Sequence, residues 1–94
     1  LIDVFLENTP KVLAEGRAAL AAHSTPQLAR VAHMLKGSCS NFGAERMRQA
    51  CARLEDLANT GVEENSDQLL SEVEKEFACV RIALERERPA CVAA

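Results

Sequence analysis

Apolar residues recur along most of the chain at intervals of three and four positions, the spacing that places side chains on one face of an α-helix. Four such segments are separated by short stretches that contain proline, glycine, asparagine or serine. No stretch sustains the alternation with a period of two that would indicate a β-strand. The pattern therefore predicts an all-α protein with four amphipathic helices.

The first predicted helix covers residues 1–23, and Asn8-Thr9-Pro10 interrupts its pattern. Proline has no backbone N–H to donate, and the asparagine or threonine side chain can cap a helix that starts after it. We therefore expect a kink or a short extra helix near Pro10, and favour a break at this point.

Caps and helix breakers set the limits of the other segments. Ser24-Thr25-Pro26 predicts a new start, because a hydroxyl cap followed by proline suits the unpaired N–H groups of a helix N-terminus. Phe42-Gly43 and Asn59-Thr60-Gly61 predict loops, Asn65-Ser66-Asp67 offers caps, and Pro89 ends the last segment. We expect the three further helices over residues 26–41, 44–59 and 67–88.

Each predicted helix carries an apolar stripe that must be covered by another helix. Because the connections are short, neighbouring helices should run in opposite directions, which predicts an antiparallel up-down four-helix bundle. The residues expected in its core are Phe5, Val12, Leu13, Ala19, Leu20, Leu28, Val31, Ala32, Leu35, Cys39, Phe42, Met47, Ala50, Cys51, Leu54, Leu57, Ala58, Leu69, Val73, Phe77, Val80 and Leu84.

Length and composition narrow the class of protein. The 94 residues suit a single domain over residues 1–94, and a start at Leu1 suggests that this domain is excised from a longer protein. The net charge of -3 argues against nucleic acid as a partner, and no apolar run approaches the roughly 20 residues of a membrane span, so we expect no direct membrane insertion. Four cysteines without a CxxC pair predict free thiols and a cytoplasmic location.

One face of the second predicted helix carries unusual residues. On a helical wheel that starts at Leu28, the apolar stripe lies within about 60°, whereas His33 falls near 140°, Lys36 near 80° and Gly37 near 180°. His33 should therefore face solvent. A glycine inside a helix costs about 1 kcal/mol relative to alanine, so Gly37 needs an explanation. Its missing side chain leaves room for another molecule to approach the imidazole, and the nearby ammonium of Lys36 suits an anion held there.

The run A-H-M-L-K-G-S at residues 32–38, together with Gly43 and the Leu54-Glu55 pair, resembles the histidine-containing phosphotransfer (HPt) domain of multistep phosphorelays. The resemblance covers nearly the whole chain. It implies that His33 takes a phosphoryl group from an aspartyl phosphate of a response-regulator receiver domain and passes it to another receiver. It also implies a phosphotransfer intermediate without autokinase activity.

The resemblance assigns roles to three further residues. Lys36 would screen the charge of the phosphoryl group, and Gly37 would let the receiver close over His33. Glu55 matches a position from which a side chain of the third helix reaches the other ring nitrogen of the acceptor histidine. An exposed imidazole titrates near pH 6.5 and needs no added base. We therefore expect no cofactor in this chain, and Mg²⁺ supplied by the receiver.

Two alternatives are weighed against this function. A zinc site of histidine and cysteine is disfavoured, because Cys39 and Cys51 fall on the core faces of their helices. A non-catalytic helical module that docks a partner around His33 stays open. The phosphotransfer function is also compatible with a histidine kinase in the same chain, and with a place as the cytoplasmic C-terminal domain of a membrane-bound sensor kinase.

Overall fold

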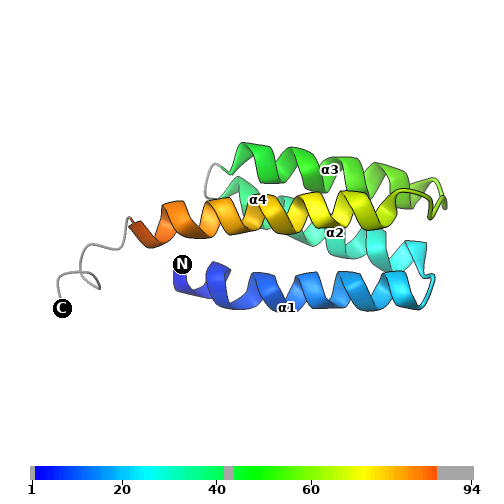
Figure 1. Cartoon of the computed structure of the whole chain (residues 1–94), viewed down its shortest axis with the longest axis horizontal. Helices are drawn as coiled ribbons and strands as arrows, with labels where there is room; N and C mark the ends of the chain where they lie inside the picture. Colours follow the sequence, from blue (N-terminus) through cyan, green and yellow to red (C-terminus); the bar gives the residue numbers. More distant parts are fainter. Residues whose placement is uncertain (1, 42–43, 87–94) are drawn as a thin grey trace.

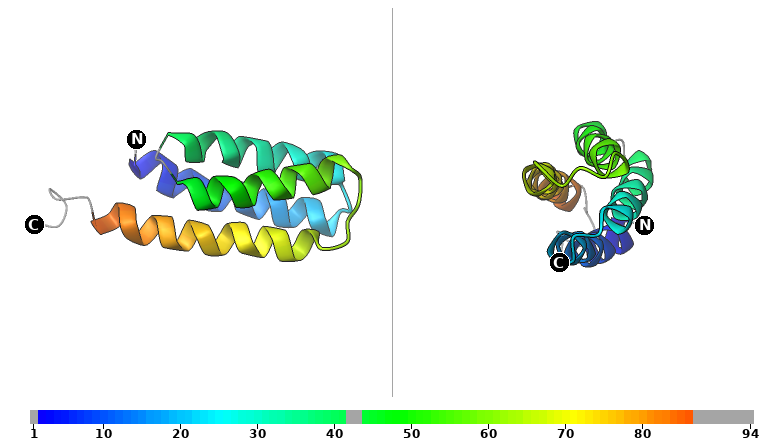
Figure 2. Two further views of the ribbon diagram at one scale, coloured as in Figure 1. Left: turned by 90° about the horizontal axis from the view of Figure 1, so that it is seen from above. Right: turned by 90° about the vertical axis from the view of Figure 1, so that its right-hand side faces the viewer.

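The computed structural model describes residues 2–41 and 44–86. These residues form four helices and no strand: α1 (Ile2–Ala21), α2 (Thr25–Ser40), α3 (Glu45–Asn59) and α4 (Ser66–Arg86). Consecutive helices run in opposite directions and lie side by side as a bundle (Figures 1 and 2). The all-α four-helix prediction is confirmed. The expected loop at Phe42-Gly43, the core position of Phe42, and residues 87–94 with Pro89 lie outside the described residues.

Helix α1 continues through Pro10, so the predicted break and short extra helix are wrong. Proline removes a single i→i−4 hydrogen bond, and Pro10 lies on the exposed side of the helix, where water can solvate the freed carbonyl. Phe5, Thr9 and Leu13 are buried on both sides of it and form one uninterrupted stripe. Thr9 is 3% exposed, so it packs into the bundle instead of capping a new helix.

The limits of α2 and α3 agree with the predicted caps. Ser24 is the N-cap of α2, its side chain accepts a hydrogen bond from the backbone N–H of Gln27, and Pro26 lies in the first turn. After α3, Thr60 is the C-cap, and Gly61 has a φ of 78°, in the left-handed region that favours glycine.

The start of α4 differs from the prediction. Ser66 is the first residue of the helix and is fully buried, and its hydroxyl donates to the carbonyl of Val62 at 3.4 Å. It therefore does not act as the cap. Asn65, with a φ of 71°, makes the left-handed turn that leads into α4, a conformation that asparagine tolerates better than most residues.

The core lies between all four helices, and α2 packs most extensively against α3. Phe5 and Phe77 join α1 to α4 by an edge-to-face contact, with their ring centroids 5.7 Å apart. Six of the residues expected in the core are only partly buried or lie outside the largest cluster: Val12, Leu20, Leu57, Leu69, Val80 and Leu84. Five residues that the apolar pattern did not select are buried: Thr9, Gly16, Ala29, Ser66 and Leu70.

Two helical glycines have opposite surroundings. A methyl group on Gly16 would lie 3.3 Å from Val31 Cγ1 and 3.4 Å from Leu70 Cδ1, so its small size lets α1 approach α2 and α4 closely. A methyl group on Gly37 would meet no atom within 4 Å. Packing therefore explains Gly16, whereas nothing in the described fold requires a glycine at position 37.

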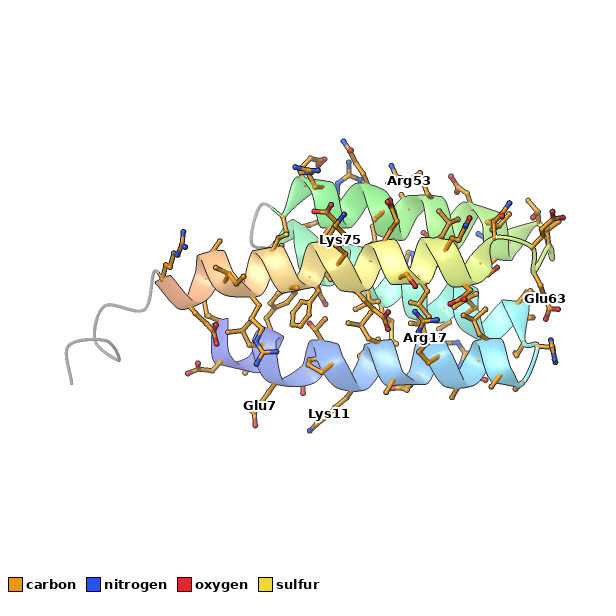
Figure 3. All side chains as sticks on the ribbon, in the orientation of Figure 1. Glu7, Lys11, Arg17, Arg53, Glu63 and Lys75 are labelled. Atoms are coloured by element: carbon orange, nitrogen blue, oxygen red, sulfur yellow. The ribbon has the colours of Figure 1, made fainter. Side chains whose placement is uncertain are left out.

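Helices α1 and α4 pack less extensively than the three pairs of consecutive helices do, and Arg17 joins them. Its guanidinium donates to both oxygens of Glu74 at 3.1 and 2.7 Å, pairs with Asp67, and donates to the Ser71 hydroxyl at 2.8 Å. Figure 3 shows the side chain directed from α1 toward α4. The hydrogen bonds to Glu74 and Asp67 raise the pKa of Arg17, so its positive charge is maintained.

The turns α1–α2 and α3–α4 meet at one end of the bundle (Figure 1). His23 follows the end of α1 with a φ of 55°, and its Nδ1 lies 3.2 Å from Glu63 Oε2 in the other turn. Both side chains are substantially exposed, so this contact contributes little stability.

Candidate functional site

His33 lies in the middle of α2 and projects into solvent, with 70% of its side chain exposed. The opposite face of α2 is buried through Leu28, Val31 and Leu35, which are 2% exposed or less. The helical wheel therefore predicted the correct side of the helix for the histidine. Because α2 is anchored by its buried face, His33 stands on a rigid element and not on a loop.

Glu55 of α3 joins two residues of α2. Its Oε2 lies 3.0 Å from His33 Nδ1, and its Oε1 lies 2.7 Å from Lys36 Nζ. Only 15% of the Glu55 side chain is exposed, because it lies in the seam between the two most extensively packed helices. With both carboxylate oxygens engaged, the orientation of Glu55 is set by its two partners.

The contact with Glu55 selects one form of the neutral imidazole of His33. An ionised carboxylate only accepts hydrogen bonds, so Nδ1 must carry the hydrogen and donate it. The second ring nitrogen, Nε2, then carries the free electron pair, and no side chain in the described part of the protein occupies it. The site therefore presents an accessible nucleophilic nitrogen, Nε2. The contact between Glu55 and Nδ1 holds the imidazole in the tautomer that leaves Nε2 without a hydrogen.

Lys36 is paired within the site, which the sequence did not predict. Its side chain is 32% exposed, and its charge is already paired with Glu55. The hydrogen bond from Lys36 holds the pKa of Glu55 below its usual value; burial opposes this effect, and the hydrogen bond from His33 adds to it. His33, Lys36 and Glu55 thus form one cluster, with a carboxylate that stays ionised between a cation and the imidazole.

This lowered pKa predicts how the cluster contributes to stability. A carboxylate whose pKa is lower in the folded state stabilises the fold above its unfolded value of about 4.3, and this stabilisation is lost as the pH falls through the folded value. Urea unfolding of the native protein and of Glu55→Gln should therefore differ most near neutral pH, and the difference should shrink toward pH 3. A difference that stays constant over this range would contradict the assignment.

Gly37 lies one turn beyond His33 and is exposed, with open space where its side chain would be. The two serines nearby donate their hydroxyl hydrogens within α2, Ser38 to the Met34 carbonyl at 3.2 Å and Ser40 to the Lys36 carbonyl at 3.4 Å. They therefore add no freely projecting donor beside the imidazole. The surface around His33 is open for a closely approaching molecule.

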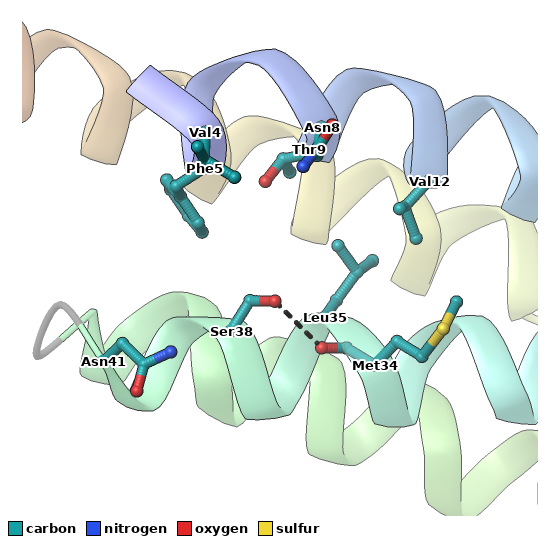
Figure 4. A pocket seen from close by; sticks show the side chains of 9 residues that line it. All are labelled: Val4, Phe5, Asn8, Thr9, Val12, Met34, Leu35, Ser38 and Asn41. Carbon is teal, nitrogen blue, oxygen red and sulfur yellow. Dashed lines mark hydrogen bonds between the residues drawn. The ribbon is translucent and has the colours of Figure 1, made fainter. Parts of the chain in front are cut away.

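A shallow apolar cavity of about 150 Å³ adjoins this surface on the α1 side. Figure 4 shows its lining, with Val4, Asn8 and Val12 from α1 facing Met34 and Ser38 from α2. Val4 is 55% exposed and Met34 is 43% exposed, and both line this cavity. The apolar pattern did not predict this cavity, although Met34, an apolar residue beside His33 that lies off the core stripe, is a signal of it in the sequence.

The cysteines do not contribute to this site. Cys39 and Cys51 are fully buried and Cys79 is exposed; all three are free thiols, and Cys91 lies outside the described residues. Contact with Cys39 and burial raise the pKa of the Cys51 thiol, so it stays protonated. Among residues 2–41 and 44–86, no group of three or more histidine, cysteine or acidic side chains could hold a metal ion.

None of the described helices combines the length and apolar character needed to cross a membrane. The described residues are thus a helical bundle whose distinctive surface is the cluster of His33, Lys36 and Glu55, bordered by Gly37.

Comparison with known proteins agrees with this geometry. The Hpt domain family matches residues 1–87. Among solved structures, the chain is similar to histidine-containing phosphotransfer protein B (HptB) from Pseudomonas aeruginosa PAO1, with 35% sequence identity and a TM-score of 0.91, over 95% of this chain and 77% of that one. No curated protein matched. The chain therefore belongs to the Hpt family, the phosphotransfer domains that act in phosphorelays as relay intermediates and not as kinases.

Proposed function

We propose that His33 is the phosphoacceptor of this Hpt domain, that the phosphoryl group is carried on Nε2, and that receiver domains of response regulators are its donors and acceptors. The observation that supports this best is the 3.0 Å contact between Glu55 Oε2 and His33 Nδ1. It leaves Nε2 with the free electron pair on a side chain that is 70% exposed.

The proposed reaction needs little from this chain besides position. The electron pair of His33 Nε2 attacks the phosphorus of the receiver's aspartyl phosphate, and the bond between phosphorus and the aspartyl oxygen breaks. The electron pair of that bond returns to the aspartate carboxylate. Such transfers depend mainly on in-line positioning and on neutralising phosphoryl charge. We assign Mg²⁺ to the receiver.

Lys36 is the residue that we assign to the phosphoryl charge. Its Nζ lies 2.7 Å from Glu55 Oε1, and it stands one helical turn from His33. A phosphoryl group on Nε2 would offer this flexible ammonium a second anionic partner. Lys36 therefore balances the charge of Glu55 in the resting domain and screens the phosphoryl group after transfer.

The apolar surface beside the site fits a protein partner better than a small phosphodonor. Val4 and Met34 expose large side chains at the cavity between α1 and α2, and Met34 directly follows His33 in the sequence. A receiver that covers this cavity would extend over the imidazole of His33. The same surface is the observation that favours a non-catalytic interaction module, in which docking occurs without transfer.

Transfer from a phosphorylated receiver tests the proposal. The receiver is loaded with radiolabelled phosphate, freed of donor and mixed with this domain and Mg²⁺. We expect label on the domain that is stable in base and labile in acid, the behaviour of phosphohistidine, and NMR spectra that assign it to Nε2 of His33. A complex that forms without transfer would support the interaction module, and label on Nδ1 would contradict the proposed role of Glu55.

Gly37→Gln tests the need for access to His33. Because a Cβ at position 37 meets no atom within 4 Å and the position is exposed, the variant should fold and gain about 0.5–1 kcal/mol from better helix propensity. The added side chain should nevertheless slow transfer from the receiver by obstructing its approach. Thermal unfolding and transfer kinetics measure the two effects. Gly37→Ala is the matched control, with similar stability and a smaller obstruction; equal transfer rates in all three proteins would refute the steric role.

A further inference from the structure

The charge of Glu55 has a consequence for the phosphorylated domain. We propose that Glu55 is the counterion of phosphorylated His33, and that its negative charge keeps the proton on Nδ1 and thereby makes the domain a fast phosphoryl donor. This inference rests on the proposed function and concerns the second half of the relay, the release of the phosphoryl group.

The bonds formed during acceptance determine the charge of the ring. In the resting site the neutral imidazole carries its hydrogen on Nδ1, facing Glu55 Oε2 at 3.0 Å. When Nε2 uses its electron pair to bond to phosphorus, Nδ1 keeps that hydrogen, so the ring becomes a cation. No proton needs to move, and the new positive charge forms beside an existing carboxylate.

The proton on Nδ1 determines how good a leaving group the imidazole is when the bond between Nε2 and phosphorus breaks. When the bond between Nε2 and phosphorus breaks, its electron pair returns to Nε2, and a ring with hydrogen on Nδ1 departs as neutral imidazole. A ring that had lost this hydrogen would have to depart as an imidazolate anion, a far poorer leaving group. The phosphoryl group passes to the aspartate carboxylate of a receiver, or to water, which releases a proton to solvent. Holding the proton on Nδ1 therefore speeds both reactions.

The structure places Glu55 well for this role. Its side chain is 15% exposed, whereas that of His33 is 70% exposed, so the carboxylate is partly shielded from water at its contact with the ring. Two further charged residues belong to α2: Lys36, which holds the second oxygen of Glu55, and Arg30, which is exposed and precedes His33 by three residues. Within the described structure, Glu55 is the acidic group in contact with the imidazole.

Lys36 couples this effect to the phosphorylation state. In the resting site its ammonium neutralises Glu55 across a distance of 2.7 Å. A phosphoryl group on Nε2 competes with Glu55 for this ammonium. When Lys36 moves toward the phosphoryl oxygens, it neutralises less of the charge of Glu55, and the carboxylate then interacts more strongly with the cationic ring. In the phosphorylated site, Lys36 can therefore pair with the phosphoryl group while Glu55 pairs with the cationic ring of His33.

Glu55→Gln separates the charge of this residue from its hydrogen bond. Glutamine has nearly the same shape and carries no charge. Its one side-chain oxygen accepts from Nδ1 when its NH2 group takes the place of the oxygen that faces Lys36. Both proteins are loaded with potassium phosphoramidate, a small phosphoryl donor, in a His23→Gln background that leaves one histidine. Loss of phosphate is followed by ³¹P NMR from pH 6 to pH 9, and the protonation of Nδ1 by ¹⁵N NMR.

At pH 8 we expect phospho-His33 to lose its phosphoryl group about threefold to tenfold more slowly in Glu55→Gln, with the Nδ1 titration midpoint moved to lower pH. Glu55→Asp, which keeps the charge, should recover part of the rate. Glu63→Gln is the matched control, since this carboxylate contacts the turn at His23 and not the site. Equal rates of phosphate loss and equal Nδ1 titration midpoints in the His23→Gln protein with and without Glu55→Gln would overturn the inference.

If Glu55→Gln does not fold, the inference is tested on the His23→Gln protein that keeps Glu55. The Nδ1 midpoint of phospho-His33 is compared in the native state and in 8 M urea, and we expect it to be lower in urea because the contact with Glu55 is lost. An unchanged midpoint would overturn the inference. Failure of the proposed function looks different: the domain would load from phosphoramidate, but a phosphorylated receiver would transfer nothing to it.

Discussion

Replacing His33 with glutamine should abolish phosphoryl acceptance from a phosphorylated receiver while leaving the fold intact. Glutamine keeps a polar side chain of similar length, but its amide nitrogen has no electron pair available for attack on phosphorus. The position is 70% exposed and no core contact depends on it, so the free energy of unfolding should change by no more than about 0.5 kcal/mol. Transfer of labelled phosphate and thermal unfolding measure the two effects.

The chain offers a matched control for this experiment. Its other histidine, His23, lies in the turn after α1 and pairs with Glu63, at the end of the bundle where the two helix turns meet. His23→Gln should accept the phosphoryl group at the native rate. If His33→Gln still accepted the phosphoryl group, or if His23→Gln lost acceptance while its fold stayed intact, His33 would not be the phosphoacceptor that we propose.

Replacing Leu54 with alanine should cause a large loss of stability. Leu54 is fully buried in α3, directly before Glu55, and it packs in the main core cluster. Truncating a buried leucine removes apolar contacts and leaves a cavity, which together cost about 2–5 kcal/mol. In a domain of this size, a loss of about 3 kcal/mol lowers the melting temperature by roughly 12–24 °C. Urea and thermal unfolding measure the loss.

Leu57 provides the comparison for Leu54 on the same helix. It is partly exposed, so Leu57→Ala removes less buried surface and should cost about 1 kcal/mol or less. Equal decreases in the free energy of unfolding for the two variants would contradict the buried position of Leu54 in the core. At a temperature where Leu54→Ala is folded, it should still accept the phosphoryl group, because His33 and Glu55 are unchanged.

Some features of the candidate site could be read from one helix at a time. The apolar stripe of α2 defines its buried face, and the angular position of His33 and Gly37 then follows from the regular turn of the helix. Gly37 stood out because it lowers helix propensity without serving the core, and the open space around it agrees with that interpretation. Exposure of His33 was therefore predictable.

The partners of His33 were not predictable in the same way. The contact of Glu55 with Nδ1 joins α3 to α2, and the periodicity of either helix leaves their relative rotation and axial shift undefined. Glu55 was singled out by resemblance to HPt domains, and its pairing with Lys36 was not foreseen at all. These contacts form because the packing of Leu54, Cys51 and their neighbours brings the two helices into one register.

Pro10 and Gly16 show the same division in the fold. The sequence by itself determined four amphipathic helices, most of their caps and the exposed face that carries His33, because these depend on interactions between residues a few positions apart. Only the tertiary structure decided that α1 continues through Pro10, that Gly16 lets three helices approach, and that Glu55 joins His33 to Lys36. The physical reason is that burial and contacts between helices contribute free energy that local preferences do not contain.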